Sequence, residues 1–337
     1  MIKEAIATIV SGQSLSRDEA AQVMEEIMEG QATPAQIAGF ITALRIKGET
    51  VEEMAGLATV MRAKAMSVPY GGPVIDTCGT GGDAQGTFNV STATAFVVAA
   101  AGLRVAKHGN RAMSSQCGSA DVLEALGVRI DLGPAQVAAC LQDVGVGFMF
   151  APSFHPAMKY AAGPRREIGI RTVFNVLGPL TNPAGAQSQL LGVAEADLAP
   201  KMAEVLRLLG SGHALVVHGQ DGVDEVSIAG PTLVCEVRDG RTLTYTVAPE
   251  DLGVRRASLA SIKGGSATEN ARAIREVLTG VPGPRRDIVV LNAAAALFAG
   301  DRATSLSSGV EMACRAIDSG MALRVLDTLI SYTQAMN

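Results

Sequence analysis

A glycine-rich run, Gly79-Thr80-Gly81-Gly82, is the strongest chemical signal in this chain. It follows a short apolar segment, 74–77, that predicts a strand, and it precedes a predicted helix that starts near Ser91. Glycines let the backbone approach an anion closely and turn its N–H groups toward it, and a helix start adds the positive end of its dipole. The run therefore predicts a phosphate cradle. A plain glycine turn between a strand and a helix is the alternative.

A second loop, Lys107-His108-Gly109-Asn110-Arg111, begins where the next predicted strand ends. The carboxyl ends of parallel strands meet at one edge of a sheet, so the two loops are expected to form one site. Lys107 and Arg111 would supply positive charge to a pyrophosphate, and nearby serines would donate hydrogen bonds. Without the first loop, a solvated basic turn would explain this segment equally well.

An acidic pair, Asp224-Glu225, follows a third predicted strand end at 218–222. Mg²⁺ prefers oxygen ligands and is usually held by one or two carboxylates together with substrate phosphates. Neighbouring residues of a strand point to opposite faces, so both carboxylates reach one metal site only from a loop. The pair predicts a magnesium site, and an exposed acidic turn is the alternative.

Four segments in order along the chain resemble the anthranilate phosphoribosyltransferases. They are 76–92, 107–127, 165–183 and Gly222-Val223-Asp224-Glu225. The resemblance covers nearly the whole chain. It implies a homodimer that transfers the phosphoribosyl group of phosphoribosyl pyrophosphate to the amine of anthranilate. The implied products are N-(5-phosphoribosyl)anthranilate and pyrophosphate, in the second step of tryptophan biosynthesis.

The resemblance also implies which residues bind each ligand. For phosphoribosyl pyrophosphate it implies Gly79, Gly82, Asp83, Thr87, Asn89, Val90, Ser91, Thr92, Lys107, His108, Gly109, Asn110, Arg111, Ala112, Met113, Ser114, Ser115 and Ser119. For anthranilate it implies Gly79, Asn110 and Arg165, and for two Mg²⁺ ions per monomer it implies Ser91, Asp224 and Glu225. Gln116 and Cys117 stand where many relatives have Lys and Ser, which removes one cationic contact from the second loop.

The implied reaction needs stabilised charge and no covalent nucleophile. Displacing pyrophosphate from C1 builds positive charge on the ribose and negative charge on the leaving group. The planar fork of Arg165 suits the acceptor carboxylate, with Arg166 and Arg171 as nearby alternatives. The aromatic amine is neutral near pH 7, so no strong base is required. His108 either orients a substrate or satisfies the loop backbone.

Helices are expected to dominate the first 65 residues. Three capping signatures recur, in which a hydroxyl is followed three positions later by Glu or Gln: Ser16 with Glu19, Thr33 with Gln36, and Thr50 with Glu53. We therefore expect a small helical domain over residues 1–70.

Residues 71–337 are expected to form a larger α/β domain with a mixed central sheet covered by helices, of the nucleoside phosphorylase and phosphoribosyltransferase type. Expected strands are 74–77, 103–106, 146–150 and 214–217, and expected helices are 91–101, 120–126 and 198–209. Asp239-Gly240 between two apolar runs predicts a hairpin, and the stretch 269–332 is expected to be mostly helical.

Composition limits the other classes of function. A formal net charge of -5 argues against nucleic-acid binding. The five cysteines are widely spaced, and the chain has no signal peptide or membrane-spanning pattern, so a cytoplasmic enzyme with small-molecule substrates is expected. Two alternatives remain: a pyrimidine-nucleoside phosphorylase that uses free phosphate, and a non-catalytic nucleotide- or RNA-binding relative. The pair Asp224-Glu225 favours a metal and a pyrophosphate leaving group over both.

Overall fold

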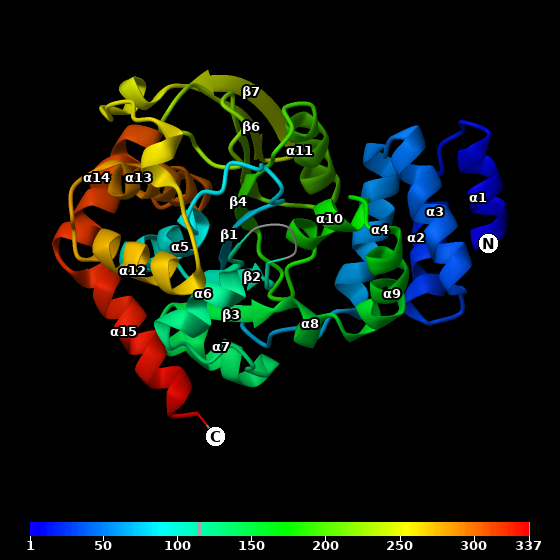
Figure 1. Cartoon of the computed structure of the whole chain (residues 1–337), viewed down its shortest axis with the longest axis horizontal. Helices are drawn as coiled ribbons and strands as arrows, with labels where there is room; N and C mark the ends of the chain where they lie inside the picture. Colours follow the sequence, from blue (N-terminus) through cyan, green and yellow to red (C-terminus); the bar gives the residue numbers. More distant parts are fainter. Residues whose placement is uncertain (113–115, 337) are drawn as a thin grey trace.

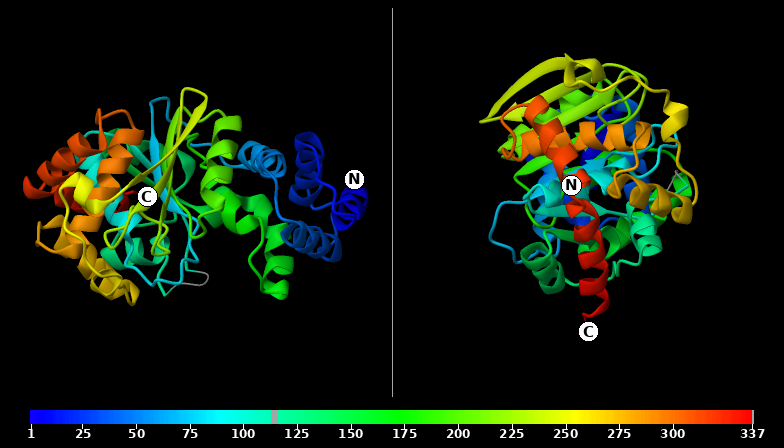
Figure 2. Two further views of the ribbon diagram at one scale, coloured as in Figure 1. Left: turned by 90° about the horizontal axis from the view of Figure 1, so that it is seen from above. Right: turned by 90° about the vertical axis from the view of Figure 1, so that its left-hand side faces the viewer.

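The structure is a computed structural model, and it describes residues 1–112 and 116–336. The chain has a small helical part at its N-terminal end and a larger α/β part (Figure 1). Figure 2 shows that the helical part projects from one end of the α/β part and carries the N-terminus near its tip. The fold class expected from the sequence is confirmed.

Local capping explains most of the helical part. Its helices are α1 (Ile2–Val10), α2 (Arg17–Met28), α3 (Pro34–Lys47) and α4 (Val51–Lys64). Complete capping boxes are present at Ser16, Thr33 and Thr50, as the sequence predicts. Each box satisfies two backbone N–H groups that the first turn of a helix leaves without partners.

One capping residue, Glu53, also links three segments of the helical part. Its side chain is 1% exposed. One carboxylate oxygen accepts from the Leu15 N–H at 2.9 Å, and the other accepts from the Thr50 N–H at 2.8 Å and from Lys47 Nζ at 2.9 Å. Glu53 therefore joins the start of α2, the end of α3 and the start of α4 through one buried charge.

We expect Glu53→Ala to lower the free energy of unfolding by roughly 3 kcal/mol, because it leaves Lys47 as a poorly solvated, unpaired charge. Urea unfolding followed by circular dichroism measures this loss. The exposed neighbour Glu52 provides the matched control, and Glu52→Ala should change stability by less than about 0.5 kcal/mol. Equal effects of the two substitutions would show that the buried network adds nothing.

A mixed seven-stranded sheet forms the centre of the α/β part, in the order β3-β2-β1-β4-β5-β6-β7. The strands are β1 (Ile75–Gly79), β2 (Val105–Gly109), β3 (Val146–Phe150), β4 (Ser188–Gly192), β5 (His213–Gly219), β6 (Thr232–Arg238) and β7 (Arg241–Val247). β1 to β5 pair in parallel, while β6 and β7 are antiparallel. The predicted hairpin is confirmed, with Asp239 and Gly240 at φ 50° and 74° in its turn.

Helices cover both faces of the sheet (Figure 1). They are α5 (Val90–Ala100), α6 (Ser119–Leu126), α7 (Pro134–Asp143), α8 (Ala151–Phe154), α9 (Lys159–Ile168), α10 (Phe174–Leu177), α11 (Leu198–Leu208), α12 (Ala267–Leu278), α13 (Pro284–Ala299), α14 (Leu306–Asp318) and α15 (Met321–Gln334). Short 3₁₀ turns are η1 (Pro156–Met158), η2 (Gly178–Leu180), η3 (Pro249–Leu252) and η4 (Leu259–Ile262).

Successive side chains of a strand point to opposite faces of the sheet, so the strands contribute to two separate hydrophobic clusters. Leu215 and Val217 of β5 belong to a cluster with α5 and α12–α15, whereas Ala214 and Val216 belong to a second cluster. That second cluster also contains the buried residues of α1–α4 and of α9–α11. The helical part and one face of the sheet thus share a single core.

Two local expectations need correction. The first two strands extend to Gly79 and Gly109, so Lys107 and His108 belong to β2 and not to the loop after it. Lys107 pairs with Phe148 in the ladder, and this tertiary pairing overrides the local polarity. Arg165 lies inside α9, which continues through Pro164 to Ile168.

Candidate active site

The glycine-rich run occupies the carboxyl end of β1 and has the backbone that the sequence predicts. Gly81 and Gly82 have φ 63° and 79°, which side-chain-bearing residues rarely adopt. The Gly81 N–H donates to Asp224 Oδ2 at 2.8 Å. A Cβ atom on Gly79 would lie 2.3 Å from the same oxygen, so only glycine allows the acidic loop to pack there.

The run leads into α5, whose start is fixed by a chain of amides. Asn89 is the N-cap residue, and its side chain donates to the Cys117 carbonyl at 3.1 Å and accepts from Asn270 at 2.9 Å. Val90, Ser91 and Thr92 form the first turn. The cap of α5 is therefore bonded both to the segment before α6 and to α12.

A buried charge lies under this helix start. Lys107 is 3% exposed, and its ammonium group donates to the Thr77 carbonyl and, at 3.3 Å, to Ser91 Oγ. Asp76 accepts from Asn182 at 2.7 Å and from the His108 N–H at 3.3 Å. Burial raises the pKa of Asp76 to about 6 and lowers the pKa of Lys107, while the attraction between the two groups opposes both shifts.

Three carboxylates, Asp83, Asp224 and Glu225, lie close together beside the glycine run. Asp224 and Glu225 lie in the loop between β5 and β6. A loop allows two adjacent side chains to face the same site, which a strand does not. Burial and then the Asp83 charge raise the pKa of Asp224 to about 6. Burial and then Asp224 raise the pKa of Glu225 well above its ordinary value, while Lys107 and hydrogen bonding from the Ser91 backbone lower it.

This acidic cluster has the donor set that suits a magnesium ion. Asp83 Oδ2 is buried and has no hydrogen-bond partner among the described residues. The described residues contain no preformed group of three or more His, Cys, Asp or Glu side chains that could hold a metal. Ser91 and substrate phosphate oxygens would therefore have to complete the coordination that Asp224 and Glu225 begin.

The second loop is organised by α6. Ser119 Oγ donates to the Asn110 carbonyl at 3.4 Å, and a Cβ on Gly109 would lie 2.1 Å from this Oγ. The Ala112 N–H donates to Asp121. Arg111, predicted to contact a pyrophosphate, forms ion pairs with Asp121 and Glu124 of α6 in the structure without ligand. Lys107 is thus the cation that contacts the helix start. The expected contacts of Met113, Ser114 and Ser115 lie outside the described residues.

A separate group of residues lies beyond the end of β2. Arg165 is half-buried in α9, and its guanidinium lies 5.1 Å from the centre of the Phe174 ring. His108 Nδ1 lies 3.3 Å from the Gly178 carbonyl, and its ring is 5.0 Å from that of His155. Both histidines have a buried Nε2 without a partner among the described residues. Burial lowers their pKa values to about 3 and 4, so both rings are neutral near pH 7.

The structure assembles some of the expected residues and leaves others apart. Gly79, Asp83, Ser91, Lys107, Asp224 and Glu225 converge by hydrogen bonds and mutual charge effects. Thr87 forms an isolated bridge with Lys263, beside the path from the glycine run to Asn89. The described contact of Arg165 is with Phe174, and not with Asn110 or Gly79. Sequence reasoning missed Asn182 and His155, because their partners are distant in the chain.

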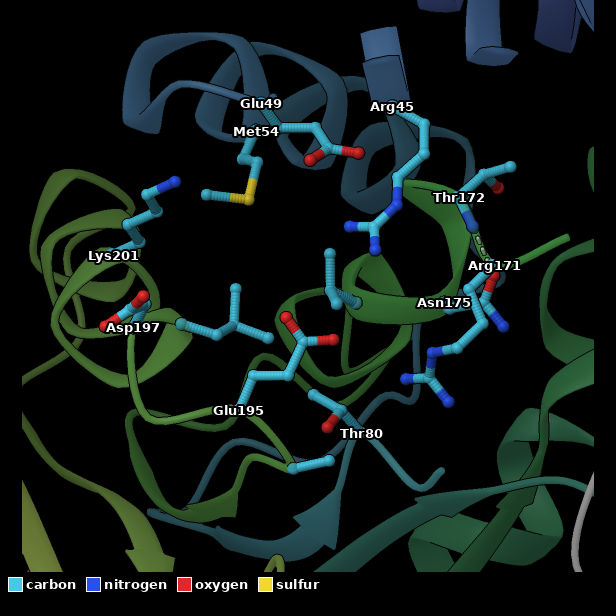
Figure 3. Close-up of a pocket in the computed structure, with 13 residues that line it drawn as sticks. Arg45, Glu49, Met54, Thr80, Arg171, Thr172, Asn175, Glu195, Asp197 and Lys201 are labelled. Carbon is cyan, nitrogen blue, oxygen red and sulfur yellow. Dashed lines mark hydrogen bonds between the residues drawn. The ribbon is translucent and has the colours of Figure 1, made fainter. Parts of the chain in front are cut away.

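A charged pocket borders the glycine run on the side of the helical part (Figure 3). Arg45 and Glu49 line it from the end of α3, and Glu195 and Lys201 line it from the segment around the start of α11. Arg171 and Thr80 form its wall toward β1.

None of the helices in the described part of the chain is long and apolar enough to cross a bilayer.

Known proteins share this arrangement over the whole chain. Residues 3–65 match the family model of a glycosyl transferase helical bundle domain, and residues 71–323 match that of a glycosyl transferase a/b domain. The anthranilate phosphoribosyltransferase of Chloroflexus aggregans is 61% identical over 99% of this chain and 98% of the relative. The chain belongs to the anthranilate phosphoribosyltransferase family. It is therefore an enzyme of the glycosyl transferase type, and the resemblance seen in its sequence is confirmed.

Solved anthranilate phosphoribosyltransferases have the same fold. The Thermus thermophilus protein is 43% identical and superposes with a TM-score of 0.92, covering 98% of this chain and 99% of that one. The Saccharomyces cerevisiae protein in complex with PRPP and Mg is 29% identical, with a TM-score of 0.91 over 99% of this chain and 98% of that one.

Proposed function

We propose that this enzyme transfers the phosphoribosyl group of phosphoribosyl pyrophosphate to the amine of anthranilate, with Mg²⁺ required. The products are N-(5-phosphoribosyl)anthranilate and pyrophosphate, which is the second step of tryptophan biosynthesis. The observation that carries the proposal is the opposition of charges around one glycine run. Lys107 and the α5 N-terminus supply positive charge beside it, and Asp83, Asp224 and Glu225 supply negative charge close to both.

In this proposal the cradle binds the donor through its backbone and its buried cation. The N–H groups of Gly82 and Asp83 and the positive end of the α5 dipole meet phosphate oxygens, and Lys107 adds positive charge. Asn110, Ser119 and the rest of the second loop close over the same ligand. A bound Mg²⁺, held by Ser91, Asp224 and Glu225, would neutralise charge on the leaving pyrophosphate. We propose two ions per monomer.

The acceptor side needs orientation more than proton transfer. Arg165 would bind the anthranilate carboxylate, with Asn110 and Gly79 beside the ring. The neutral imidazoles of His108 and His155 leave two nitrogens free for a neutral amine or its leaving proton. This arrangement supports an uncharged nucleophile attacking C1 while charge separates on the donor.

Two further proposals concern assembly and organisation. We propose a homodimer, as the family resemblance implies, with the exposed side chains of Val10 in α1 and Ile46 in α3 as candidate contacts. We place the division between the helical and α/β domains at residues 70 and 71. We also propose that the enzyme is cytoplasmic and has no nucleic-acid or membrane partner.

The test of the proposed function is direct. Protein, Mg²⁺, phosphoribosyl pyrophosphate and anthranilate are mixed, and the loss of anthranilate fluorescence is followed with and without chelator. Loss that requires both the donor and Mg²⁺ supports the proposal. Turnover of a pyrimidine nucleoside with free phosphate, and none of anthranilate, would assign the chain to the alternative chemistry instead.

Arg165→Ala should raise the KM for anthranilate roughly tenfold to a hundredfold, as expected for one lost hydrogen bond to a charged group. The KM for phosphoribosyl pyrophosphate should change by less than about threefold. Initial-rate kinetics with each substrate varied in turn separate the two. Arg166→Ala, one position along the same helix and exposed, is the comparison. A larger anthranilate effect in Arg166→Ala would move the assignment to that residue.

A further inference from the structure

Arg171 makes an unusual contact with the phosphate cradle. One guanidinium nitrogen, Nη2, donates to the Gly81 carbonyl at 3.0 Å. The other, Nη1, occupies the space next to Gly82 so closely that a Cβ on Gly82 would lie 1.5 Å from it. The sequence placed Arg171 only among the alternatives for the acceptor carboxylate. The structure places it on the donor side.

The Gly81 residue is therefore held on both of its backbone polar groups. Its N–H donates to Asp224 Oδ2, which comes from the loop after β5. Its carbonyl accepts from Arg171, which comes from the segment before α10. Both contacts act on a residue with φ 63°, next to Gly82 with φ 79°. Glycine-rich loops lose much conformational entropy when they become ordered, so two such contacts preorganise the cradle.

Arg171 has no carboxylate partner among the described residues, although acids lie in the pocket that it borders. Figure 3 shows Arg171 and Glu195 on either side of Thr80, with Arg45 farther up the pocket. An ordinary surface arginine would gain little from a carbonyl contact. Here the guanidinium is held against the loop whose shape the donor needs.

The same segment also reaches the acceptor side. Three residues after Arg171, Phe174 packs its ring against the guanidinium of Arg165. The backbone between them is pinned, since the Thr172 N–H donates to Asn175 Oδ1 at 2.9 Å. A displacement of the segment 171–175 would therefore shift the cradle and the proposed acceptor arginine together.

We propose that Arg171 is a positioning residue that holds the Gly81-Gly82 turn in its donor-binding shape and couples it to the acceptor-binding segment. The expected kinetic effects of this role rest on the proposed function. The restraint on the loop does not, because it is present without substrate. Arg171 acts through the backbone of Gly81, and it need not touch either substrate.

The test compares Arg171→Met, which keeps bulk but removes the donor, with Arg171→Lys, which keeps a charged donor. Arg171→Met should raise the KM for phosphoribosyl pyrophosphate about tenfold, as the loss of one charged hydrogen bond predicts, with a smaller change in the KM for anthranilate. Arg171→Lys should recover most of this loss. Arg241→Ala, an exposed arginine at the start of β7, is the control and should match the unmodified enzyme.

A second measurement needs no activity. Hydrogen–deuterium exchange of the substrate-free protein should show faster exchange of residues 79–86 in Arg171→Met than in the unmodified protein or in Arg171→Lys. The proposal would be overturned if Arg171→Met changed neither the exchange rate of residues 79–86 nor the KM for phosphoribosyl pyrophosphate. A rise in the KM for anthranilate alone would assign Arg171 to the acceptor carboxylate. If the unmodified protein has no transferase activity, the proposed function fails, and the exchange result alone decides the restraint.

Discussion

The double substitution Asp224→Asn/Glu225→Gln should reduce turnover by roughly a hundredfold or more, because several kcal/mol of charge stabilisation are lost with the metal ligands. The Mg²⁺ concentration that gives half-maximal activity should rise as well. Glu225 is buried, and Asp224 raises the pKa of Glu225, as Asp83 raises that of Asp224, so a cation between these carboxylates would relieve their repulsion. Steady-state rates over a range of Mg²⁺ concentrations measure both quantities.

Protein stability separates this result from simple misfolding. The replaced carboxylates repel each other and Asp83, so the substituted protein without metal should melt at the same temperature as the unmodified one, or higher. Asp239→Asn in the β6–β7 turn is the control, since asparagine tolerates the positive φ there. An unchanged Mg²⁺ dependence with full turnover would leave Asp224 and Glu225 as a structural acidic turn.

Gly82→Val should weaken phosphoribosyl pyrophosphate binding by about a hundredfold or more. Two effects combine at this position: a β-branched residue at φ 79° is strained, and its Cβ would overlap Arg171 Nη1. Strain of this kind costs about 1–3 kcal/mol by itself, so the loop must rearrange and lose its anion-binding shape. Titration calorimetry with donor and Mg²⁺ measures the affinity.

Gly86→Val is the matched control for Gly82→Val. Gly86 lies in the same loop at φ 64°, and no atom lies within 4 Å of a Cβ placed there. It shares the backbone strain but lacks the collision with Arg171. A similar loss of affinity in both proteins would show that strain alone matters, whereas full affinity in Gly82→Val would remove the cradle assignment.

Local chemistry explains which features the sequence could predict. The capping boxes at Ser16, Thr33 and Thr50 depend on residues three positions apart, and the hairpin at Asp239-Gly240 depends on two adjacent ones. Each is decided within a few residues, so a pattern in the chain is enough to place it. The glycine run followed by a helix is a signal of the same kind.

Contacts between distant residues account for most of what the sequence did not predict. Asp224 reaches Gly81 across 143 positions, and Asn182 reaches Asp76 across 106. Arg111 pairs with the acids of α6, and Arg171, an alternative for the acceptor carboxylate, contacts the cradle. Charge and spacing identified these side chains as active-site candidates, but only the packed structure determines which partner each one finds.

The core that the helical part shares with the sheet makes the two parts mutually dependent. Phe40, Leu44 and Leu57 of the helices lie in one cluster with Leu191 and Val216 of the strands. Removing the first four helices would expose this face of the remaining protein to water, with the tendency to aggregate that a large apolar surface brings. The proposed boundary near residue 70 thus separates two segments of sequence that share one core, and an exchanged helical bundle would have to bring a matching surface with it.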